Sequence, residues 1–266
     1  MKKITVIGGD DRLRVVADAL QKENYAVNTL GLYDKDDADI TGSDVILLPV
    51  PTTRDSKTVF CPLTGRHVLL SQIQNDTHAK QLILCCNYRF DGRNCIDYGS
   101  LDSYAILNAV PTAEGAIRLA IENTPYTLWQ SRVLVIGYGR VGKILADRLR
   151  ALGCFVTVSG RKSADFAMLD ALGFSRMHTE RLGDSPLEFD IVFNTVDAVV
   201  IDDAALKDCR ARLLIDLSTR GGFSIEAAKK LGINAIKAPG LPGQISPMTA
   251  SKILFATVTD LINQYT

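Results

Sequence analysis

A glycine-rich stretch, "GYGRVG", follows the apolar run 132–136 and precedes a segment with helical spacing. In such a turn the first glycine permits the bend, the second lets the backbone approach a pyrophosphate, and the third lets helix pack against strand. Amide groups at the start of the helix then point at the phosphates. The placement inside a strand–helix–strand unit predicts a dinucleotide site rather than a turn kept for packing, with contacts from Gly137, Gly139, Arg140, Val141 and Gly142.

The next strand, "FVTVSG", ends at a basic corner where an NAD site carries an acidic residue. That acidic residue, about 20 residues beyond the glycines, accepts from the ribose 2′-hydroxyl and would repel a 2′-phosphate. Here Ser159, Arg161, Lys162 and Ser163 supply hydroxyl groups and cations suited to a phosphate, while Asp165 is expected in the following helix. We therefore predict NADP as the cofactor, the alternative being a solvated basic turn.

Two further strand ends carry short polar side chains. Ligands of doubly wound sheets bind beyond the carboxyl ends of the strands, so Asn194 and Thr195 are expected near the cofactor, as is Asp216. Ser218 and Arg220 follow directly and are candidates for contact with a substrate. The alternative is that such residues only close turns and cap helices. We predict no catalytic histidine and no metal site, because neither a His–carboxylate pair nor a cluster with ligand spacing is visible.

The order of the elements predicts an α/β protein with two Rossmann-like, doubly wound domains, parallel sheets and a cleft between them. The expected strands of the second domain are 132–137, 155–160, 190–196, 212–218 and 234–240. Residues 103–111 are expected to form the last strand of the first domain, and Thr112 to cap the helix that follows. The predicted boundaries are 1–110 together with a C-terminal helix over 247–266, and 111–246 for the cofactor domain.

Composition limits the function classes. Thirty basic and thirty acidic residues cancel, which argues against nucleic acid or an anionic membrane as the partner. No run reaches the about 18 apolar residues of a membrane span, and the six cysteines have no C-x-x-C spacing. These features favour a cytoplasmic protein with reduced thiols that acts on a small molecule.

Several stretches together resemble the family of dipicolinate synthase A subunits from endospore-forming bacteria. They are "VIGGD", "NAVPTAEGAIRLAI", "GYGRVG", "DLSTRGG" and "APGLPG" followed by "SPMTASKIL", and they span nearly the whole chain. The resemblance implies two Rossmann-like domains, NADP in the second, and oxidation of a dihydrodipicolinate-type product of the lysine pathway during sporulation. It also implies a partner, the flavoprotein-like B subunit of dipicolinate synthase. The segment "LCCNYRFDGRNC" does not match the pattern.

A ring with two carboxylates needs N–H donors or cations at two separate points, and arginine suits a planar carboxylate. We therefore expect Arg89, Thr112 and Ser218 to bind substrate, with Glu114 and Arg220 as the candidate catalytic residues. Aromatisation favours the reaction, so that the protein mainly positions the ring and excludes water. The alternatives are a non-catalytic regulatory subunit that binds NADP and a 2-hydroxy-acid-type dehydrogenase. We also expect a homodimer through the C-terminal helix.

Overall fold

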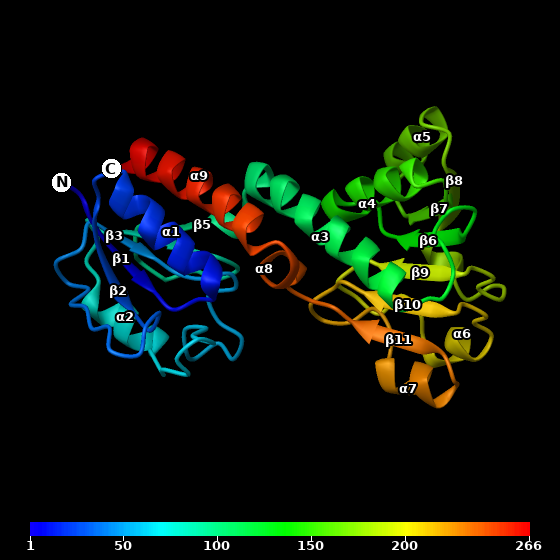
Figure 1. The fold of residues 1–266 in the computed structure, drawn as a ribbon, viewed down its shortest axis with the longest axis horizontal. Helices are drawn as coiled ribbons and strands as arrows, with labels where there is room; N and C mark the ends of the chain where they lie inside the picture. The colour runs from blue at the N-terminus through cyan, green and yellow to red at the C-terminus, as the bar shows by residue number, and fades with distance from the viewer. The chain divides into compact units, whose positions relative to one another are not determined.

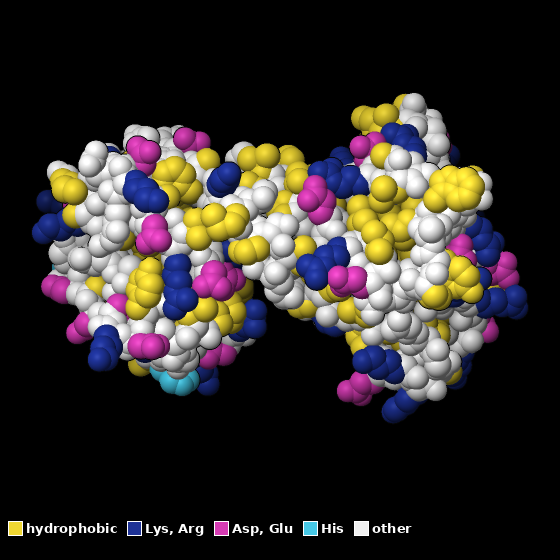
Figure 2. Space-filling model, in the orientation of Figure 1, with side chains coloured by type: hydrophobic (Ala, Val, Ile, Leu, Met, Phe, Trp, Pro, Cys, Tyr) yellow, Lys and Arg dark blue, Asp and Glu magenta, His cyan; other side chains and the backbone are white.

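The computed structural model describes residues 1–266, which form two compact units. The first unit comprises Met1–Asn108 and Ser246–Thr266, and the second comprises Ala109–Ile245. Each unit is built on one parallel sheet with helices on its two faces, so the predicted α/β class with two parallel-sheet domains is confirmed. Figure 2 shows acidic and basic side chains mixed over the visible face of each unit. None of the helices combines the length and the apolar composition that crossing a membrane requires.

The first unit has a five-stranded sheet in the order β2-β1-β3-β4-β5. One face packs against α1 and α9, which run side by side in Figure 1, and the other face packs against α2. The elements are β1 (Lys3–Ile7), α1 (Asp11–Lys22), β2 (Ala26–Leu30), β3 (Val45–Leu47), α2 (Leu70–Asp76), β4 (Leu82–Cys85), β5 (Cys95–Asp97), the 3-10 turn η1 (Tyr98–Ser100) and α9 (Pro247–Tyr265).

The second unit has a six-stranded sheet in the order β11-β10-β9-β6-β7-β8, all parallel. Strand order reverses between β6 and β9, which is the point where such sheets bind a dinucleotide. The elements are β6 (Arg132–Ile136), α4 (Arg140–Ala151), β7 (Phe155–Gly160), α5 (Ser163–Ala171), β8 (Ser175–His178), the 3-10 turn η2 (Thr179–Arg181), β9 (Ile191–Asn194), α6 (Asp203–Lys207), β10 (Leu213–Asp216), α7 (Ile225–Lys230), β11 (Asn234–Lys237) and α8 (Leu241–Ile245).

The inner strands of the second unit form because their residues are apolar on both faces. Val133–Ile136 of β6 are fully buried between two cores, one with α3 (Asp102–Glu122), α4 and α5 and the other with α6 and α7. All five strands expected here are present, and β8 is a sixth. Its side chains are largely exposed, so this edge strand has no apolar run by which the sequence could reveal it.

The prediction for residues 103–112 is wrong. Instead of a strand and a helix start, one helix, α3 (Asp102–Glu122), runs through the segment with Pro111 inside it. Its buried alanines at 109, 113, 116 and 120 keep a helical spacing across the proline, so packing compensates for the hydrogen bond that Pro111 cannot donate. Thr112 is therefore not an N-cap, and its neighbours' amide groups are not a free helix start. The division between the two units falls inside this helix.

Candidate functional site

The glycine-rich turn joins β6 to α4, as the sequence predicted. Gly137 has φ of +98°, and a Cβ there would lie 2.7 Å from the Thr195 Oγ1 atom. A Cβ on Gly142 would lie 2.1 Å from the carbonyl oxygen of Gly137, so only glycine allows α4 to pack against this turn. A Cβ on Gly139, by contrast, would meet nothing within 4 Å. The backbone at Gly139 is thus open to a ligand, as the dinucleotide interpretation requires.

Strand register brings the polar strand ends into one row across the sheet. Ile136 of β6 lies opposite Ser159 of β7 on one side and Asn194 of β9 on the other. Asn194 in turn lies opposite Asp216 of β10, which lies opposite Lys237 of β11. The row follows the carboxyl edge of the sheet, so side chains that are far apart in sequence meet beside the glycine-rich turn.

The basic corner after β7 consists of Arg161 and Lys162. Both side chains are exposed, and neither makes a hydrogen bond or an ion pair in the chain. Ser163 is exposed as well and begins α5. Two uncommitted cations beside the site are available to an anionic ligand.

Ser159 differs from its predicted role at that corner. Its side chain is fully buried, and its hydroxyl shares a hydrogen bond of 3.0 Å with the hydroxyl of Thr179, the first residue of η2 directly after β8. Ser159 thus links β7 to the segment after β8 through a buried hydrogen bond and does not take part in the exposed basic corner. Sequence reasoning missed Thr179, because the strand before it was not identified. The neighbouring His178 ring packs on Phe166 at 4.4 Å between ring centres.

The strand ends of β9 and β10 form a buried polar network. The Asn194 amide donates to an Asp216 carboxylate oxygen at 2.8 Å and to the Val196 carbonyl at 2.9 Å. The same Asp216 oxygen accepts from the amide and the hydroxyl of Ser218, and the second oxygen accepts from the Gly222 amide and the Lys237 ammonium.

Five donors therefore hold the Asp216 carboxylate, which is fully buried. Burial by itself would raise the pKa of this carboxyl. The Lys237 ammonium and the donors from Asn194, Ser218 and Gly222 act together against burial. They outweigh it, so the pKa of the Asp216 carboxyl lies below its usual range. Asp216 and Asn194 are both fully buried, so we assign both side chains to the support of the strand ends rather than to direct contact with a cofactor. Thr195 likewise donates its hydroxyl to the Ile136 carbonyl at 2.9 Å.

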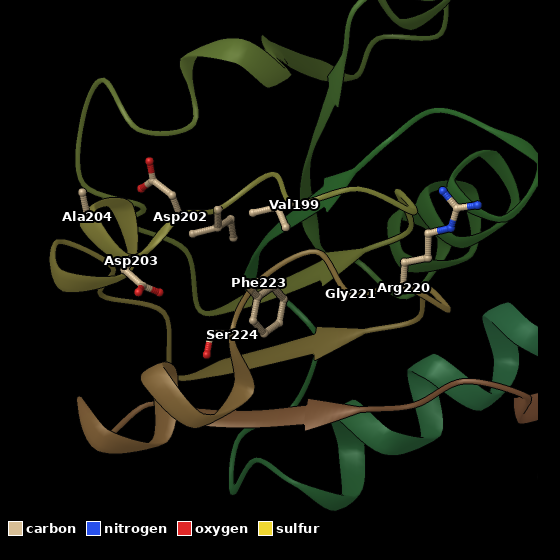
Figure 3. A pocket seen from close by; sticks show the side chains of 9 residues that line it. Val199, Asp202, Asp203, Ala204, Arg220, Gly221, Phe223 and Ser224 are labelled. Atoms are coloured by element: carbon tan, nitrogen blue, oxygen red, sulfur yellow. The ribbon is translucent and has the colours of Figure 1, made fainter. Parts of the chain in front are cut away.

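Arg220 lies next to this network and is 83% exposed. Its amide donates to Asp197 at 2.6 Å, and its guanidinium lies 3.8 Å from the same carboxylate. Figure 3 shows Arg220 at one end of a pocket, with Asp202 and Asp203 at the other. The pocket measures about 620 Å³ and is also lined by Val199, Ile201, Ala204, Gly221, Phe223 and Ser224.

The structure does not bring Glu114 to this edge. Its carboxylate pairs with Arg148 at 3.1 Å on the surface between α3 and α4. Arg148 is eight residues beyond Arg140, so the pair lies about 12 Å along α4 from the helix end that faces the glycine-rich turn. Glu114 therefore lies away from the glycine-rich turn, and its assignment as a base stays a prediction. Arg89 is exposed in the loop after β4 of the first unit.

Comparison with known proteins adds relatives over the full length. A family model described as the N-terminal domain of the dipicolinate synthase A subunit matches residues 3–106. The chain is 32% identical to the dipicolinate synthase A subunit of Bacillus subtilis (strain 168), and the match covers 98% of this chain and 95% of that protein. The crystal structure of the corresponding A subunit from Bacillus halodurans is 28% identical, with a TM-score of 0.89 and coverage of 98% and 97%.

A likeness of fold extends to a D-lactate dehydrogenase from Lactobacillus jensenii, whose crystal structure contains NAD+. It is 12% identical, with a TM-score of 0.62 and coverage of 99% of this chain and 96% of that chain. This likeness shows that the two chains share a dehydrogenase-like fold.

Proposed function

The chain belongs to the family of dipicolinate synthase A subunits. On that premise we propose that it oxidises a dihydrodipicolinate-type compound of the lysine pathway to pyridine-2,6-dicarboxylate, with NADP as the hydride acceptor. The observation that carries the choice of cofactor is the pair of uncommitted cations, Arg161 and Lys162, beside an open glycine-rich turn. A carboxylate at that corner would repel a 2′-phosphate, whereas these two residues attract it.

The residues present fit a nicotinamide dinucleotide. The strand order reverses beside β6, the Gly139 backbone is open, and the first amides of α4 face the same edge. NAD+ in the D-lactate dehydrogenase of the same fold supports this class of cofactor. Such a cofactor supplies an acceptor for the hydride that leaves the substrate ring.

Arg220 is the group of the second unit best suited to a substrate carboxylate. Its guanidinium is exposed, and only one distant carboxylate oxygen, at 3.8 Å, faces it. A dihydropyridine dicarboxylate that loses one hydride and one proton becomes an aromatic pyridine, so the ring itself favours the reaction. The task left to the chain is to hold the ring by its carboxylates and to exclude water.

Assembly with a second protein is part of the proposal. The relatives are named as the A subunit of their enzyme, which supports a complex with a further component. We propose that the partner is the flavoprotein-like B subunit of dipicolinate synthase, and that hydride transfer takes place on this chain.

Hydride transfer by the purified chain tests the function. Incubation with the dihydrodipicolinate-type compound and NADP+ is expected to produce NADPH and pyridine-2,6-dicarboxylate, with NAD+ as a poorer acceptor. Arg220→Met should lose turnover and retain NADPH affinity, because Arg220 does not belong to the glycine-rich turn or the basic corner. If no NADPH forms either with or without the B subunit, the proposal is refuted and a non-catalytic, regulatory role is favoured.

A further inference from the structure

The segment 217–224 between β10 and α7 is wrapped around the Asp216 carboxylate. Both ends of the wrap are tied to it, since the Ser218 amide donates to one oxygen at 3.0 Å and the Gly222 amide to the other at 3.0 Å. The Ser218 hydroxyl donates to Asp216 at 2.7 Å and accepts from the Gly221 amide at 3.1 Å. The path of this segment therefore depends on the carboxylate at its centre.

Two glycines make the wrap possible. Gly221 has φ of +109°, a region that favours glycine, and a Cβ on Gly222 would lie 2.0 Å from the Asn194 side-chain nitrogen. Arg220 stands immediately before them. Arg220 lines one end of the pocket in Figure 3, and its place there depends on the path of the segment held to Asp216 and on the bond from its amide to Asp197.

Lys237 is the charged partner of Asp216. It comes from the neighbouring strand β11, and its ammonium lies 2.9 Å from the carboxylate and 3.4 Å from the Ser218 hydroxyl. The Lys237 side chain is 30% exposed, whereas that of Asp216 is fully buried. An ionised carboxylate in such a place needs a counter-charge, and the four other donors are uncharged.

We propose that Lys237 is a positioning residue for Arg220: by keeping Asp216 ionised, it holds segment 217–224 in the path that presents the Arg220 guanidinium to the substrate. The inference rests on the proposed function, which it deepens by assigning the control of the substrate-binding arginine. Lys237 touches neither the cofactor nor the substrate in this role, and acts through Asp216.

The charges around Asp216 give the role a pH signature. Among the groups near Asp216, Asn194 on β9 is neutral, and Asp197 after β9 pairs with Arg220. The cation in contact with the Asp216 carboxylate is therefore Lys237. Without Lys237 burial remains and the carboxyl protonates at higher pH. A protonated carboxyl has one acceptor fewer for the segment's donors, so the segment loosens as the pH falls through this raised pKa.

The kinetic test compares Lys237→Met with Lys237→Arg and with the control Lys230→Met. Lys230 is an exposed lysine of α7 whose side chain makes no hydrogen bond or ion pair. With NADP+ and the dihydrodipicolinate-type compound, Lys237→Met should lower kcat/KM about tenfold or more and move the acid limb of the pH profile to higher pH. Lys237→Arg should restore the position of the limb, and the control should match the wild type. An unmoved limb in Lys237→Met would overturn the inference.

A double substitution separates action through Arg220 from general damage. If Lys237 acts by positioning Arg220, then Lys237→Met should cost little further activity in a chain that already carries Arg220→Met. If the double variant instead lost activity by the product of the two single-variant factors, the inference would be overturned. Affinity for pyridine-2,6-dicarboxylate in the presence of NADP+ should show the same pattern.

A spectroscopic measurement tests the network without any reaction. The Gly222 amide proton, which donates to Asp216, should keep its NMR shift in the wild type as the pH is lowered towards the usual carboxyl range. In Lys237→Met it should titrate at higher pH, and a wild-type-like titration there would overturn the inference. Should the wild type fail to reduce NADP+ while the amide behaves as expected, the proposed function fails and the role of Lys237 in holding the segment stands.

Discussion

Two alanine substitutions in the glycine-rich turn separate its packing role from its ligand role. In Gly142→Ala the new methyl group would lie 2.1 Å from the Gly137 carbonyl oxygen, where a normal carbon–oxygen contact is about 3.3 Å. Helix α4 and the turn must therefore move apart by about 1.2 Å. Overpacking of this kind costs about 2–3 kcal/mol, which corresponds to a fall in Tm of roughly 4–12 °C for a domain of this size.

Gly139→Ala should behave in the opposite way. Its backbone, with φ of −83° and ψ of −164°, is extended and open to alanine, and the methyl group meets nothing within 4 Å. We expect the free energy of unfolding to change by less than about 1 kcal/mol. NADPH affinity should still fall about tenfold or more, because the methyl group fills the space through which a pyrophosphate approaches the backbone.

The assay is thermal unfolding of the full chain without nucleotide, paired with fluorescence titration of NADPH. Gly142→Ala is expected to lower both Tm and affinity, and Gly139→Ala to lower affinity alone. A wild-type affinity in Gly139→Ala would refute the assignment of this space to a phosphate. A wild-type Tm in Gly142→Ala would refute the close contact between α4 and the turn.

Three further predictions concern charges and thiols. Arg161→Glu should weaken NADPH binding about tenfold or more and leave NADH binding nearly unchanged, as measured by calorimetry, because the new carboxylate repels only a 2′-phosphate; equal losses for both would contradict the cofactor choice. The lowered pKa of Asp216 means that its charge stabilises the fold above the ordinary carboxyl pKa of 3.8, and that this contribution is lost as the pH falls through the lower folded value. Asp216→Asn should therefore be less stable than the wild type to urea at neutral pH, with the difference shrinking below about pH 4. A hydrogen bond with the Cys85 thiol at 3.2 Å lowers the pKa of the Cys95 thiol. Cys95 should therefore alkylate faster than the buried Cys154 in peptide mapping. Replacement of Cys85 by alanine should slow the alkylation of Cys95 relative to the wild type.

The local sequence was sufficient wherever one element carried its own signal. The inner strands of the second unit are apolar on both faces, and the glycine spacing is typical of a turn between a strand and a helix. The signal failed at α3, where an apolar run followed by Pro111 is typical of a strand that ends. Only the packing of the alanines along α3 against the second sheet shows that the helix continues through the proline.

The candidate site was only partly visible for the same reason. Asp216 and Ser218 stand together in one motif, and their bond is local. The partner that balances the buried charge is Lys237, 21 residues away, and it meets Asp216 only because β10 and β11 pair in that register. Ser159 and Thr179 are another such pair, joined across β7 and β8.

The sequence by itself determined the class of fold, the glycine-rich turn between β6 and α4 and the basic corner after β7, because glycine spacing, apolar runs and side-chain charge act within a few residues. Tertiary structure alone decided which polar strand ends are buried and saturated and which remain open to a ligand. Which side chains are buried depends on strand register and on neighbours that are distant in sequence. Asp216 and Ser159 are buried in this way and stabilise the strand ends, whereas Arg161, Lys162 and Arg220 remain exposed.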